Sequence, residues 1–98
     1  MTGPKTGGRS KYLKAQKFSN FHEFTMIETM HEAEAKVSIS LMLYHLGRTP
    51  EAIVSTEVAI NELSSVQNDE NIQQGIRDEA ANSLQASQTL LARLKAGQ

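Results

Sequence analysis

Residues 21–46 read FHEFTMIETMHEAEAKVSISLMLYHL and contain neither glycine nor proline. At the spacing of an α-helix, the apolar side chains of this stretch fall into two separate stripes. The first stripe holds Met26, Met30, Ala33, Val37, Leu41 and Tyr44. The second stripe holds Phe21, Phe24, Ala35, Ile39, Met42 and Leu46, and the polar remainder is a narrow wedge at His22, Thr29, Lys36 and Ser40. A helix that is apolar on two sides needs two neighbours.

The ends of this helix are predicted from its flanking residues. Ser19 or Asn20 can cap the first turn, and Glu23 stands three residues after Asn20, as in a capping box. Gly47 can terminate the helix in a left-handed conformation. We therefore expect a helix over about residues 21–46.

A second helix is expected over about residues 50–66. Thr49 can cap it, Pro50 suits the first helical position, and Glu51 complements the positive end of the helix dipole. Its apolar stripe consists of Ala52, Ile53, Ala59, Ile60, Leu63 and Val66. Val54 and Val58 fall on the other side of this helix.

A third helix is expected over about residues 70–95. The polar run at residues 67–71 is the predicted break before it, although the absence of proline also allows one long rod. A single apolar stripe on this helix comprises Ile72, Ile76, Ala80, Leu84, Leu90, Leu91 and Leu94. One stripe serves one interface.

These elements predict an all-α fold, either a helical hairpin or a three-helix bundle with coiled-coil-like packing, formed by residues 19–98. A chain of 98 residues fits one domain with a thin core. The helix over 50–66 is shorter than the helix over 21–46, and every aromatic residue precedes position 45. Part of the first helix is therefore expected to stay uncovered within one chain, and a two-fold homodimer is the simplest way to complete the fold.

Residues 1–18 are expected to form a flexible basic arm, because three glycines and a proline occur among polar residues at its start. Five of the ten basic residues lie here, and no acidic residue precedes Glu23. The cations are Lys5, Arg9, Lys11, Lys14 and Lys17. A basic arm thus precedes an acidic body.

The leading functional hypothesis is a small, non-enzymatic regulatory or adaptor protein that acts through an apolar helix surface. The residues predicted to form this surface are Phe18, Phe21, Phe24, Ile39, Met42 and Leu46. Methionine suits such a surface because its unbranched thioether adapts to irregular partners. The sequence contains no cysteine, and no serine or threonine occurs at a recognised motif spacing from a catalytic base. Neither catalysis nor a cofactor is therefore expected. Without an apolar leader, the expected location is the cytoplasm.

Two alternatives come from other residues. The basic arm, with Tyr12 and Phe18 between its cations, could bind the phosphates and bases of a nucleic acid. Glu28 and His31 have the Glu-x-x-His spacing of metal ligands on one helical face, and Glu57 or Glu62 could add a carboxylate. This weak motif makes a metal-bound helical dimer the second alternative.

Overall fold

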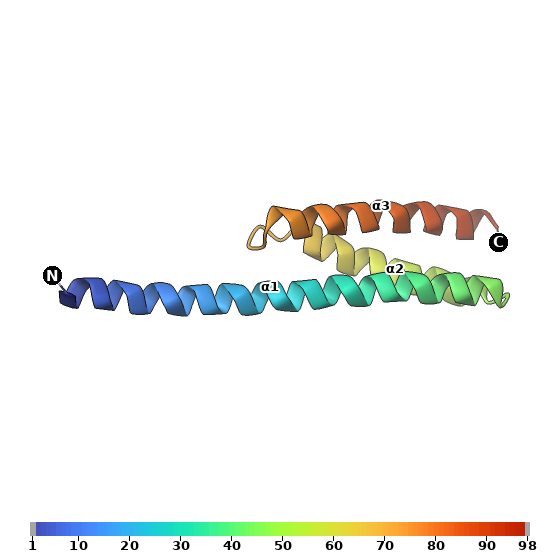
Figure 1. Ribbon diagram of the computed structural model, residues 1–98. Helices are drawn as coiled ribbons and strands as arrows, with labels where there is room; N and C mark the ends of the chain where they lie inside the picture. The colour runs from blue at the N-terminus through green and yellow to red at the C-terminus, as the bar shows by residue number, and fades with distance from the viewer. Residues whose placement is uncertain (1, 98) are drawn as a thin grey trace.

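The computed structural model describes the backbone of residues 2–97 and the side chains of residues 20–97. These residues form three helices and no strand: α1 (Thr2–His45), α2 (Thr49–Gln67) and α3 (Gln74–Ala96). As Figure 1 shows, α2 runs back along α1, and α3 runs back along α2. The molecule is elongated, with extents of 69 × 18 × 14 Å. The predicted all-α fold with three helices is confirmed, and the alternative of one long rod after residue 50 is excluded.

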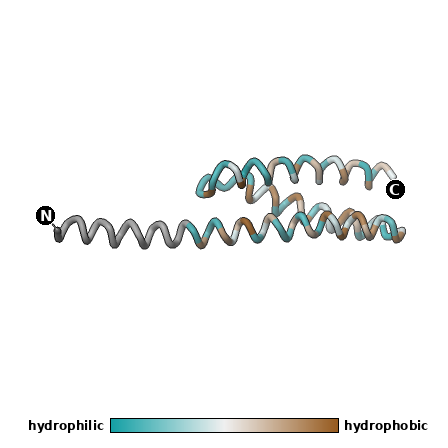
Figure 2. The backbone as a smooth tube through the Cα atoms, viewed as in Figure 1, coloured by the Kyte–Doolittle hydropathy of each residue, from teal (hydrophilic) through white to brown (hydrophobic). Residues whose placement is uncertain are grey.

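The helix α2 is the centre of the bundle, because it packs against both α1 and α3, whereas α1 and α3 contact one another much less. The larger core cluster joins all three helices and consists of Met30, Ala33, Ala59, Leu63, Val66, Ile72 and Ala80. A smaller cluster at the other end consists of Ala52, Ile53 and Leu94. Small alanine side chains at buried positions let the helix backbones approach closely. Figure 2 shows hydrophobic residues recurring along α1 and α2 where these helices run together.

The apolar stripes predicted for the second and third helices are confirmed. Every member of both stripes is buried or half-buried, whereas Val54 and Val58 on α2 are exposed. Ile72 is buried even though it lies in the turn before α3, which begins at Gln74 rather than at the predicted position of about 70. Helical periodicity therefore found the inward faces of α2 and α3.

The predicted start of the first helix is wrong. Its α-helical backbone begins at Thr2, so Ser19 and Asn20 lie inside α1 and do not cap its first turn. A stretch without glycine or proline between residues 9 and 46 continues the helix favourably in both directions from Asn20. The side chains of the basic arm lie outside the described residues, and the arm's flexibility stays a prediction.

The turn between α1 and α2 is a Schellman motif, as Gly47 predicted. Gly47 has a φ of +78°, and its amide donates to the carbonyl of Tyr44 at 3.0 Å. The amide of Arg48 donates to the carbonyl of Leu43 at 2.8 Å. Thr49 does not cap α2, because the N-cap residue is Arg48, which makes no side-chain cap and forms a bidentate ion pair with Glu51 instead.

Replacing Gly47 with alanine is expected to lower the free energy of unfolding by about 1 kcal/mol, since a Cβ is unfavourable at this positive φ. No atom lies within 4 Å of that Cβ, so the cost is conformational rather than steric. Gly75→Ala is the matched control: it also has open space and no positive φ, and it should not lower stability. Urea denaturation of both variants measures the difference, and equal stabilities would contradict the assignment.

Candidate functional site

The second apolar stripe of α1 is exposed along its whole length. We call Phe21, Phe24, Ala35, Ile39, Met42 and Leu46 the outer stripe, and all six side chains are exposed. The exposed fractions of Phe21 and Phe24 are 72% and 57%, and those of Met42 and Leu46 are 64% and 70%. The expectation that one chain cannot cover both stripes of this helix is therefore confirmed for this structure.

The bundle covers α1 along most of the first stripe and part of the neighbouring polar wedge, whereas Leu41 and Tyr44 at the end of that stripe are exposed. Met30 and Ala33 of the first stripe are buried, and Ser40 of the wedge is also fully buried. Lys36 of the wedge donates from Nζ to Glu62 Oε1 of α2 at 2.7 Å, while its carbonyl accepts from the Ser55 hydroxyl at 3.0 Å. The contacts of α2 thus lie on the wedge and the first stripe, and among the described residues neither α2 nor α3 buries the outer stripe.

The C-terminal end of the outer stripe continues into a groove between α1 and α2. Its lining residues are Ile39, Leu43, Pro50, Glu51, Val54 and Ser55, and its volume is about 490 Å³. Val54 is 59% exposed at its edge. Leu43, Pro50 and Val54 were not among the residues predicted to form the interaction surface. The position of Val54 outside the buried stripe of α2 could have indicated its exposure. The α1–α2 groove makes this end of the surface concave.

One carboxylate of α1 and one of the α2–α3 turn connect α1 to this turn at the other end of the bundle. His22 Nε2 is paired with Asp69 Oδ2, and Glu23 Oε2 accepts the backbone amide of Gln73 at 2.9 Å. Gln73 is the N-cap of α3 and has no side-chain cap of its own. Glu23 therefore serves α3 from a distance in the role that a capping box gives to a glutamate of the same helix.

Asp69 is expected to make stability depend on pH. The backbone amide of Asn71, 2.8 Å from Oδ1, lowers the pKa of Asp69, as does His22, while burial opposes this shift. A lowered folded-state pKa adds stability above the ordinary Asp value of about 4, and this is lost as the pH falls through the folded-state pKa. Asp69→Asn should thus be less stable than wild type near neutral pH, with a difference that shrinks in acid. Denaturation of both proteins at several pH values measures this stability difference. A difference that stays constant with pH would contradict the lowered pKa of Asp69.

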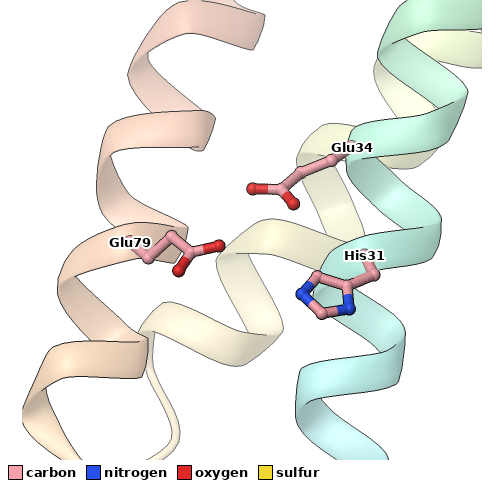
Figure 3. A group of neighbouring side chains, drawn as sticks. All are labelled: His31, Glu34 and Glu79. Atoms are coloured by element: carbon pink, nitrogen blue, oxygen red, sulfur yellow. The ribbon is translucent and has the colours of Figure 1, made fainter.

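The predicted metal ligand His31 has different carboxylate neighbours from those expected. Figure 3 shows His31 and Glu34 on α1 facing Glu79 on α3. The ligand atoms of these three residues lie within 4.8 Å of one another, and Glu28 is not part of this group. The two carboxylates expected from α2 are elsewhere: Glu62 is paired with Lys36, and Glu57 Oε2 lies 3.7 Å from Lys95 Nζ. The Ser83 hydroxyl donates to Glu34 Oε2 at 2.6 Å and so fixes one carboxylate between α1 and α3.

This group has the chemistry to bind a divalent cation. One imidazole nitrogen and two carboxylate oxygens are ligands that Zn²⁺ accepts, at bond lengths of about 2.0–2.2 Å. His31 and Glu79 are exposed and Glu34 is half-buried, so modest side-chain rotations could bring the three ligands to one ion. Such an ion would connect α1 and α3, the two helices that contact each other least.

No match was found for this chain among protein-family models, curated proteins or solved structures. None of the helices in the described part of the chain combines the length and the apolarity needed to cross a bilayer. Phe18 and the five cations of the basic arm lie outside the described side chains, so their part in a site stays a prediction.

Proposed function

We propose that this chain is a small, non-enzymatic, cytoplasmic adaptor or regulatory protein that binds a protein partner through the outer stripe of α1. The observation that supports this proposal is the exposure of all six outer-stripe side chains beside a bundle whose own buried core contains no aromatic residue among those described. The largest apolar side chains of residues 20–97 are thus on the surface. The α1–α2 groove extends the stripe with a concave apolar surface.

The energy available at this surface is comparable to the cost of association. Removing one side chain of the size of Phe, Met or Leu from water is worth about 1.5–3 kcal/mol when it is fully buried. Partial burial of several outer-stripe residues can therefore offset the cost of association, which is about 4–15 kcal/mol. Aromatic side chains contribute most at such interfaces, which favours Phe21 and Phe24 as anchors.

Substitution at the C-terminal end of the surface tests this function directly. Met42→Ser combined with Leu46→Ser should abolish capture of a partner from the native host, because both side chains are more than half exposed at the C-terminal end of the outer stripe. Thr89→Ser combined with Gln85→Ser is the control, since both positions are exposed and lie on α3 rather than on α1. Equal capture by wild type and the Met42/Leu46 variant would exclude this end of the stripe as the binding surface.

Metal binding is a second candidate function, favoured by the convergence of His31, Glu34 and Glu79 from two helices. Titration of chelator-treated protein with Zn²⁺ should raise the melting temperature of the wild type and of His45→Ala, and should leave that of His31→Ala unchanged. His45 is an exposed histidine outside the group, which makes it the matched control. The same rise in all three proteins would show that the ion binds elsewhere.

Nucleic-acid binding by the basic arm stays a hypothesis without a supporting contact.

A further inference from the structure

The outer stripe is interrupted by negative charge. Glu28 and Glu32 are exposed on α1 between the phenylalanine pair and Ile39. At helical spacing both glutamates share the face of the outer stripe, seven and eleven residues after Phe21. Neither forms an ion pair with the described side chains. An occupant of this surface must therefore offer apolar side chains and positive charge in alternation.

The chain itself contains a segment with that pattern. Phe18 stands three residues before Phe21, and Lys14 stands seven residues before it. On the other side, Phe24 follows Phe21 by three residues, and Glu28 follows it by seven. Farther out, Gly7 and Ala35 are each fourteen residues from Phe21. Three pairs of positions related by Phe21 therefore match: aromatic with aromatic, lysine with glutamate, and small with small.

We propose that two copies of this chain pair antiparallel along α1 about a two-fold axis at Phe21, so that the basic arm of each copy covers the outer stripe of the other. This inference rests on the proposed function, because it names a second copy as the protein that covers most of the stripe. A two-fold axis at Phe21 places Phe18 of one copy opposite Phe24 of the other, and Lys14 opposite Glu28. The Phe21 side chains of the two copies lie next to each other at the axis. Gly7 of one copy lies opposite Ala35 of the other, and both residues are small.

The bundle leaves room for this pairing. The α-helical backbone of α1 is continuous from Thr2 to His45, so one straight element carries both halves of the pattern. Contacts of the described side chains with α2, α3 and their turn begin at His22 and occupy the other side of α1. The arm, with a rise of about 1.5 Å per residue, covers about 28 Å and reaches to about Ile39. Met42, Leu46 and the α1–α2 groove stay open for a further partner.

Charge reversal tests the pairing. Glu28→Lys and Lys14→Glu should each weaken homodimerisation about tenfold, because a like-charge contact occurs twice in each symmetric dimer. Mixing the two variants should restore association through a heterodimer, in which both arm–stripe contacts are again opposite in charge. Glu70→Lys and Arg93→Glu change the net charge equally at exposed positions outside α1, and they should leave dimerisation unaltered. Sedimentation equilibrium of the four single variants and of the mixture measures these effects.

The failures of the two proposals can be distinguished. A wild-type chain that sediments as a monomer up to its solubility limit would overturn the antiparallel pairing. So would a dimer that is unaffected by both charge reversals, or a mixture of the variants that forms no heterodimer. If in those cases Met42→Ser with Leu46→Ser still abolishes partner capture, the proposed function stands without the dimer. If the dimer forms as described and this double variant captures as wild type does, the pairing stands and the adaptor function does not.

Discussion

Leu63→Ala is expected to lower the free energy of unfolding by about 3 kcal/mol, which is a large share of the stability of a domain this size. Leu63 is fully buried on α2, the helix that contacts both neighbours, and it belongs to the larger core cluster. Alanine lacks three of the side-chain carbons of leucine, so Met30 and Val66 of the same cluster would face unfilled space. The cost therefore combines lost burial with a cavity.

Urea denaturation of the Leu63→Ala variant measures this loss. Val58→Ala on the same helix is the matched control, because Val58 is 41% exposed and its truncation should cost less than about 1 kcal/mol. If Leu63→Ala were as stable as Val58→Ala, the packing of α2 between α1 and α3 would be refuted.

The second large effect is expected at the outer stripe, where it concerns association rather than folding. Phe21→Ser combined with Phe24→Ser should weaken dimerisation by more than about 100-fold, because each symmetric interface loses four phenylalanine side chains. The stability of the isolated subunit should change by less than about 1 kcal/mol, because both side chains are more than half exposed there. A large loss in association with a small change in folding is typical of an interface residue.

Two measurements separate these contributions. Sedimentation equilibrium gives the dimer dissociation constant, and denaturation of dilute protein gives the stability of the subunit. A variant that unfolds much more readily than wild type at high dilution, or one that dimerises as wild type does, would contradict the assignment of Phe21 and Phe24 to the interface.

The inward faces of α2 and α3 could be predicted because they depend on local periodicity alone. Positions such as Ala59, Leu63 and Leu94 recur at helical spacing, and all three are buried. The excess of apolar surface on α1 was also predicted from spacing. The number of apolar stripes on a helix can be read from its sequence, whereas the choice of the stripe that faces the bundle depends on tertiary packing.

Contacts between distant residues could not be predicted from the sequence. Glu23 has the spacing of a local capping box, but its carboxylate reaches Gln73 across the bundle. The Glu28 and His31 spacing suggested a shared ligand face, but His31 lies near Glu34 and a carboxylate of α3. The wedge residue Ser40 was expected to be a polar boundary between the stripes, and it is buried. In each case the partner lies on another helix, and its position depends on how the helices pack.

The outer stripe of α1 is proposed to be an interface between two copies, and the reactivity of a single thiol tests this proposal most directly. The chain has no cysteine, so Ala35→Cys introduces one unique thiol at the centre of the stripe, and Ala92→Cys introduces one at an exposed position on α3. The alkylation rate of each thiol is measured from dilute to concentrated protein. We expect the rate at position 35 to fall as the concentration rises, while the rate at position 92 stays constant. Constant rates at both positions over the whole range would contradict the account.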